Sequence, residues 1–127
     1  MAEPIFFTSA AHKGRFIEVV QRLGKTWPEA GGTFDPEYAA ALYILTSDAG
    51  MWNKAHDYVS STGIDIDTLL QEVPTSGGEG VLIQIAGNLF NNQQHLDPLE
   101  FLRLDESNFR VALTAILLRR YGYRDAA

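Results

Sequence analysis

Apolar and polar positions along this chain repeat with helical spacing, and short polar or glycine-rich stretches separate the repeats. The clearest repeat runs from Asp105 to Tyr121, where apolar residues leave only a narrow polar stripe on the helical circumference. Asp105 can cap the first turn, and Gly122 is a typical helix stop. A helix that is apolar on most sides needs cover on most sides. The pattern therefore predicts a central, mostly buried C-terminal helix at about 105–121.

The other helices are predicted to begin at capping side chains that precede apolar spacing: Ser9 or Thr8, Asp35, Asp48, Asp65, Ser76 and Asp97. Ser76 and Glu79 have the spacing of a capping box. Gly87 lies inside the helix that follows, where a close crossing by another helix would explain a residue that disfavours helix. No stretch alternates apolar and polar residues with the enrichment in β-branched residues that a strand would show. We expect one all-α domain over 1–127, a compact bundle of five or six helices around the C-terminal helix.

Length and composition agree with a globular chain. The 127 residues are enough for a sizeable core, and 46% of them are hydrophobic. There is no cysteine, which removes disulfide and thiolate chemistry and fits a reducing cytoplasm. The first ten residues lack the basic and apolar regions of a signal peptide, and the apolar run at 105–121 is too short to span a bilayer. We therefore expect a cytoplasmic protein without membrane association.

Charge is unevenly distributed along the chain. The net charge is −6, with acidic residues concentrated at 51–80 and five arginines at 101–124. Phosphate contacts supply much of the affinity for nucleic acids, so an acidic chain is a poor candidate for that partner. The acidic segment is better suited to the basic surface of a protein partner.

Motifs for catalysis or metal binding are absent from the sequence. The histidines are spaced too widely for a local metal motif: His12, His56 and His95. Asp65 and Asp67 lack the glycine and glutamate of a calcium loop, so helix capping is the better interpretation of Asp65. No serine lies in a nucleophile elbow. We predict no catalytic residue, metal or cofactor, and we leave enzymatic activity open while favouring its absence.

Two groups of residues remain as candidate sites. The first combines arginine and tyrosine, which are enriched at protein interfaces, and it closes the C-terminal helix: Arg119, Arg120, Tyr121, Tyr123 and Arg124. Its simpler interpretation is that the arginines stabilise the helix end and the tyrosines complete the core. The second group would serve a small-molecule pocket: Gln84, Asn88 and His95.

The order of elements resembles a family of small bacterial and phage-associated helical proteins that is classed as a domain of unknown function. The resemblance rests on five segments that together cover most of the chain: FFTSAAHKGRFIEVV, DPEYAAALYILTSD, MWNKAHDYV, LIQIAGNLFN and DESNFRVALTAILLRRYG. These motifs consist mainly of core and cap positions. The resemblance implies a helical fold and a prokaryotic or viral setting, and it implies no reaction.

From these observations we expect a small cytosolic adapter or inhibitor that binds a protein partner and has no catalytic activity. An inhibitor encoded by a phage and directed at a host protein is one version of this expectation. The alternative is a small-molecule or nucleotide-binding protein, with or without enzymatic activity. The sequence does not indicate the oligomeric state.

Overall fold

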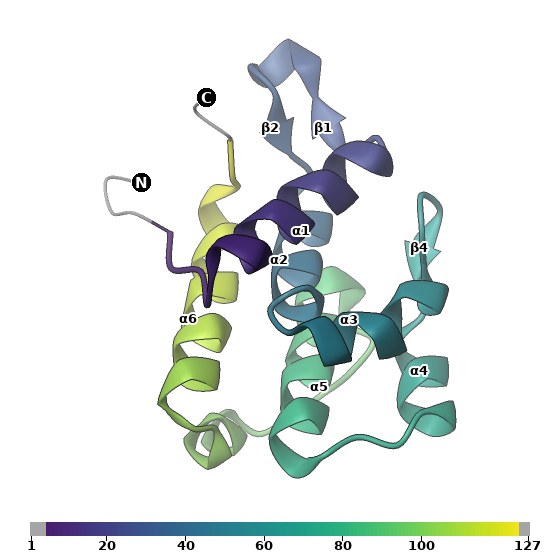
Figure 1. The fold of residues 1–127 in the computed structure, drawn as a ribbon, viewed down its shortest axis with the longest axis vertical. Coiled ribbons are helices and arrows are strands. Elements are labelled where there is room, and N and C mark those ends of the chain that lie inside the picture. Colours follow the sequence, from purple (N-terminus) through teal and green to yellow (C-terminus); the bar gives the residue numbers. More distant parts are fainter. Residues whose placement is uncertain (1–4, 125–127) are drawn as a thin grey trace.

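The computed structural model describes residues 5–124, and its elements are mainly helical (Figure 1). The α-helices of this part of the chain are α1 (Ala10–Arg22), α2 (Pro36–Leu45), α3 (Ala49–Ala55), α4 (Ile66–Glu72), α5 (Gly77–Asn91) and α6 (Glu106–Tyr121). Short 3-10 helices connect them: η1 (Pro28–Ala30), η2 (His56–Tyr58) and η3 (Pro98–Arg103). None of the helices within residues 5–124 is long and apolar enough to cross a membrane.

Helix α2 is the centre of the fold. Every residue from Tyr38 to Leu45 is buried, and α2 packs against α1, α5 and α6. Figure 1 shows α2 in the middle of the molecule, with α6 along one edge and α3 and α4 on the opposite side. The run from Ala39 to Ala41 explains this position, because small side chains let neighbouring helices approach closely.

The prediction that the C-terminal helix is central and mostly buried is wrong. Helix α6 buries one face, formed by Val111, Ala112, Thr114, Ala115 and Leu118, and exposes much of the other. Its outward apolar residues stay in solvent because α2 and α5 cover only the inner side. The high apolar content of α6 therefore did not indicate burial. The uninterrupted apolar run of α2 was the better indicator of the buried central helix.

The prediction of no strand is also wrong, although the strands are only two residues long. Strands β1 (Thr26–Trp27) and β2 (Thr33–Phe34) form one antiparallel hairpin, and β3 (Val59–Ser60) and β4 (Gly63–Ile64) form another. Strands this short contain no alternation that a sequence pattern can reveal. The fold is therefore predominantly helical with two small hairpins, and it is not strictly all-α.

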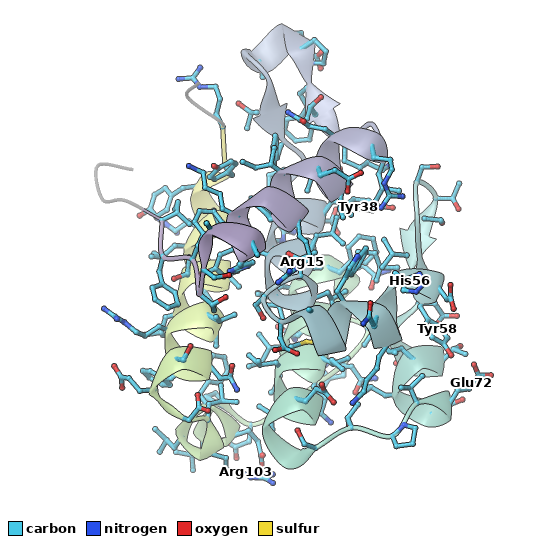
Figure 2. All side chains as sticks on the ribbon, in the orientation of Figure 1. Arg15, Tyr38, His56, Tyr58, Glu72 and Arg103 are labelled. Carbon is cyan, nitrogen blue, oxygen red and sulfur yellow. The ribbon has the colours of Figure 1, made fainter. Side chains whose placement is uncertain are left out.

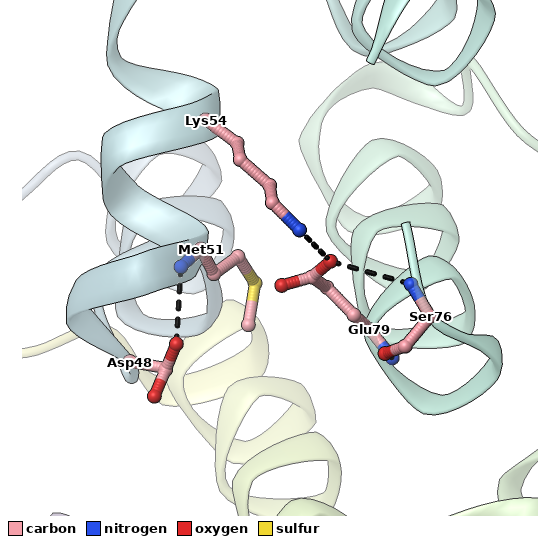
Figure 3. Close-up of polar contacts among 5 residues, drawn as sticks. All are labelled: Asp48, Met51, Lys54, Ser76 and Glu79. Atoms are coloured by element: carbon pink, nitrogen blue, oxygen red, sulfur yellow. Dashed lines mark hydrogen bonds and ion pairs between the residues drawn. The ribbon is translucent and has the colours of Figure 1, made fainter. Parts of the chain in front are cut away.

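The predicted helix starts are confirmed by side-chain caps. Asp35, Asp48, Asp65, Ser76, Asp97 and Asp105 each accept a hydrogen bond from a backbone N–H in the first turn of the helix that follows. At α5, Ser76 and Glu79 form the complete capping box. The Glu79 carboxylate also forms an ion pair with Lys54 of α3, in which Lys54 Nζ donates to Glu79 Oε1 at 2.6 Å (Figure 3). The same carboxylate thus caps α5 and ties it to α3.

Gly87 of α5 lies at a close crossing, as predicted. A Cβ atom built at this position would stand 2.8 Å from Ile66 Cγ2, at the start of α4. Real Cβ atoms do not approach that closely, so glycine is required for α4 and α5 to pack as they do. Side-chain bonds to backbone carbonyls tie other elements together. For example, Arg15 Nε of α1 donates to the carbonyl of Thr46 after α2, at 3.0 Å (Figure 2).

Candidate functional site

The outward face of α6 is the most unusual surface in the described chain. Four apolar side chains of this helix are each 40 to 57% exposed: Leu113, Ile116, Leu117 and Tyr121. Single exposed leucines are ordinary on soluble proteins, but several on one face of one helix form a contiguous patch that is typical of an interaction site. We call these four residues, together with Arg110 and Arg120, the α6 surface.

A second exposed apolar spot lies just before this helix. Leu99 and Leu102 of η3 are 67% and 72% exposed, and η3 packs against α6. Asp97 caps the start of η3, and Asp105, directly after η3, caps the start of α6. The apolar residues near α6 therefore extend beyond the helix itself.

The arginines of α6 have no carboxylate partner within residues 5–124. The guanidinium carbon of Arg110 lies 5.0 Å from the centre of the Phe6 ring, and that of Arg120 lies 5.3 Å from the Tyr121 ring. Arg119 Nε donates to the carbonyl of Leu89 near the end of α5, at 2.9 Å. Arg110 and Arg120 thus keep their charge available to solvent or to another molecule.

The C-terminal candidates predicted from the sequence separate into two groups in the structure. Arg119, Arg120, Tyr121 and Arg124 are exposed, but Tyr123 is not part of the same patch. Gly122 adopts a φ of 77°, and the chain then turns inward.

Tyr123 belongs to an aromatic cluster formed with Phe7, Phe16, Phe34 and Tyr43. Its ring lies 5.2 Å from the ring of Phe16 and 5.1 Å from that of Phe34, and its carbonyl accepts a 2.7 Å hydrogen bond from the Phe34 N–H. Of the two interpretations of this tyrosine, completion of the core is the one that matches its position.

The predicted pocket residues do not converge. Gln84 lines an open hollow of about 470 Å³ between α4 and α5. The Asn88 side chain donates instead to the Gln94 carbonyl and to Asn92 Oδ1. His95 is exposed and is not among the residues that line this hollow.

Two further open hollows lie among residues 5–124, and carboxylates dominate both. A hollow of about 540 Å³ at the β3–β4 hairpin is lined by Asp57, Asp65 and Asp67, without lysine or arginine. Another of about 560 Å³, where α3, α5 and α6 begin, is lined by Asp48, Glu79 and Asp105 against the single cation Arg103. Four of these carboxylates already cap helices, so the structure accounts for their positions without a ligand.

His12 is a buried polar residue to which the sequence assigned no role. Its Nδ1 accepts a hydrogen bond from the Thr8 N–H at 3.1 Å, so Nε2 carries the proton and donates to the Tyr43 carbonyl at 2.8 Å. Burial lowers the pKa of His12 from 6.5 to about 4, and nearby Arg15 adds to this effect, while the bond to Tyr43 opposes it. Both ring nitrogens are occupied, so this histidine has a structural role and no free position for a metal.

Other titratable groups give no sign of an active site. Burial raises the pKa of Tyr43, whose hydroxyl donates to the Phe6 carbonyl. The Tyr58 hydroxyl donates to the Glu72 carboxylate at 2.8 Å, which raises the pKa of this half-buried tyrosine. Figure 2 shows the pair at one edge of the molecule. No cluster of three or more histidine, aspartate or glutamate residues within 5–124 is arranged to hold a metal.

No protein-family model, no curated protein and no solved structure matches this chain. The family resemblance drawn from the sequence therefore stays a prediction. The function has to be argued from the residues of this chain, and the α6 surface is where exposure, apolar character and unpaired charge coincide.

Proposed function

We propose that this chain is a protein-binding protein, of the adapter or inhibitor kind, and that the α6 surface is its contact site. The observation that carries the proposal is the row of half-exposed apolar side chains on α6: Leu113, Ile116, Leu117 and Tyr121. Apolar side chains that remain in water are stabilised when a partner covers them, and each fully buried leucine contributes about 1.5–3 kcal/mol.

The composition of this surface also fits a protein partner. Tyrosine and arginine are enriched among the residues that dominate binding energy, and Tyr121 and Arg120 lie side by side at the end of α6. Arg110 and Arg120 have no carboxylate partner of their own within residues 5–124. The matching partner would present an apolar face flanked by carboxylates. The cysteine-free sequence suits a partner in the cytoplasm.

The test is an affinity pull-down in which the wild-type chain is compared with Leu117→Glu and with Arg120→Glu. We expect proteins captured by the wild type at physiological salt to be lost with Leu117→Glu, because a carboxylate would be buried without a partner. Arg120→Glu should weaken capture and change its salt dependence, while urea unfolding stays cooperative.

The matched control is Arg22→Glu, which reverses an exposed arginine in the last turn of α1. It carries the same unfavourable interaction with a helix dipole, about 0.3–1 kcal/mol, but lies on another helix. It also removes the exposed 3.0 Å ion pair between Arg22 and Glu18, so it tests folding at least as severely as Arg120→Glu. Capture that survives both α6 substitutions, or that is lost equally with Arg22→Glu, would reject the α6 surface as the contact site.

Small-molecule or nucleotide binding is the second candidate, since the three hollows of about 470 to 560 Å³ are large enough for a ligand. The two larger hollows have an excess of carboxylates, which disfavours phosphate-bearing ligands there. A thermal-shift screen with nucleotides and with cationic metabolites tests it, and the absence of any concentration-dependent rise in Tm would reject it.

A further inference from the structure

On the outward face of α6, two residues of opposite charge are placed at equal distances on either side of a central leucine. Glu106, Leu113 and Arg120 are spaced by seven residues, so they fall on nearly one line along the helix. All three are exposed, and Leu113 points away from the side on which Val111 and Leu118 are buried. Glu106 and Arg120 each lie about 10 Å along the helix axis from Leu113.

The two charged ends of this line are not neutralised within the described chain. Neither Glu106 nor Arg120 forms an ion pair with another residue of 5–124. The carboxylate lies in the first turn of α6 and the guanidinium in the last, which favours the helix dipole. Helix α6 therefore presents a negative start, an apolar middle and a positive end on one face.

From this arrangement we infer that α6 pairs with α6 of a second copy of the chain in antiparallel orientation, with the two-fold axis at Leu113. The inference rests on the proposed function, because it identifies the protein that the α6 surface binds. In this orientation Glu106 of each copy faces Arg120 of the other, so both unpaired charges are neutralised. A parallel pair would instead place like charges opposite each other.

The apolar residues match in the same register. Leu113 meets its own counterpart at the axis. Phe109 and Leu117, four residues to either side, face each other across the interface, and Phe109 is already half-buried. Arg110 and Ile116, three residues to either side, also pair, so that the aliphatic stem of the arginine lies on isoleucine. One surface thus serves as both partners, as a two-fold interface requires.

Figure 1 shows that α6 runs along one edge of the molecule, with α2 and α5 on its inner side. Phe6 packs against Arg110 of this helix, so a second copy would meet α6 together with the Phe6 ring. A single helix pair lies at the low end of specific interfaces, roughly 1,200 Å² in total, so we expect a dissociation constant in the micromolar range.

Sedimentation equilibrium over a concentration series tests the pairing. We expect reversible dimerisation of the wild type, about tenfold weaker dimerisation for Glu106→Arg and for Arg120→Glu, and recovery to within about threefold of the wild type in the double variant. The control is Glu29→Arg, which makes the same charge reversal on the exposed 3-10 helix of the first hairpin and should leave dimerisation unchanged.

Cross-linking gives an independent test, since the chain contains no cysteine. Leu113→Cys is expected to form a disulfide dimer under mild oxidation, because a residue on the two-fold axis meets its own copy. Thr62→Cys, at the exposed turn between β3 and β4, serves as the matched control and should stay monomeric.

The inference is overturned if the wild type stays monomeric to millimolar concentration, or if the double charge reversal dimerises no better than the single ones. It is also overturned if Leu113→Cys cross-links no faster than Thr62→Cys. If the wild type is monomeric but still captures another protein through Leu117, the proposed function stands. If it neither dimerises nor captures another protein, the proposed function is rejected together with the inference.

Discussion

Buried His12 makes the stability of this protein depend on pH in a way that can be measured. The pKa of His12 falls from 6.5 to about 4 on folding, chiefly because burial disfavours the charged ring. The unfolded chain therefore binds the proton more readily than the folded chain between these two values. The contribution of His12 to the free energy of unfolding is complete above pH 6.5 and is lost as pH falls toward 4.

The magnitude follows from the size of the pKa change. At about 1.4 kcal/mol per unit, the shift corresponds to about 3 kcal/mol once pH lies below both values. Lowering the pH from 7 to 5 removes about 2 kcal/mol of it, because the histidine of the unfolded chain is then almost fully protonated and that of the folded chain is not. For a domain of this size, about 2 kcal/mol is a substantial part of the total stability.

The assay is urea unfolding at pH 7 and at pH 5, followed by circular dichroism, for the wild type and for His12→Gln. The variant removes the titrating ring, so it reports the pH dependence of every other group. We expect the variant to be less stable at pH 7, by roughly 1–3 kcal/mol, because the Thr8 N–H and the Tyr43 carbonyl lose partners. Between pH 7 and pH 5 it should then lose about 2 kcal/mol less than the wild type.

Equal losses in the two proteins would refute this account of His12. A direct check is the titration of the His12 ring by NMR in the folded wild type. A ring that titrates near 6.5 would show that burial does not hold the imidazole neutral, whereas no change above pH 5 is expected. His56 and His95 are exposed and are present in both proteins, so the comparison isolates the contribution of His12.

Further predictions concern glycines and caps. Gly14→Ala should raise the free energy of unfolding by about 0.5–1 kcal/mol, since this glycine lies on the exposed side of α1 and nothing lies within 4 Å of the added methyl group. Gly87→Ala should lower the free energy of unfolding by roughly 1–3 kcal/mol, because the added methyl group would overlap Ile66. Urea unfolding measures the free energy of unfolding of both variants, and a stabilising effect of Gly87→Ala would refute the close crossing. Ser76→Ala should cost about 1 kcal/mol by removing the hydrogen bond to the Glu79 N–H, and an unchanged urea midpoint would show that the cap contributes nothing.

The features that sequence predicts well here are the local ones. A cap joins a side chain to a backbone N–H two or three residues away, so the starts of α2, α3, α4 and α5 follow from neighbouring residues alone. The crossing at Gly87 was also accessible, because an interior glycine costs helix stability and needs a reason. These elements depend little on the rest of the fold.

The features that sequence missed depend on contacts between distant segments. Leu113 and Leu42 are both leucines in apolar helices, yet Leu42 is fully buried and Leu113 is half-exposed, because neighbours surround only α2. Likewise, Tyr123 is drawn from the predicted interface into the core by Phe16 and Phe34, about 90 to 110 residues earlier in the chain. Arg120 and Tyr121 are exposed, and their role at an interface stays a prediction, while the predicted pocket residues do not meet.

The aromatic cluster also has a consequence for how the protein is made. Phe16 is enclosed by rings from both ends of the described chain, including Phe7 and Tyr123, whose centres are 6.5 Å apart. During synthesis, the first hairpin and α1 leave the ribosome long before Tyr123, so one wall of the cluster is missing until translation is nearly finished. The nascent chain therefore carries an open aromatic surface for most of its synthesis, and that surface is where a chaperone would act.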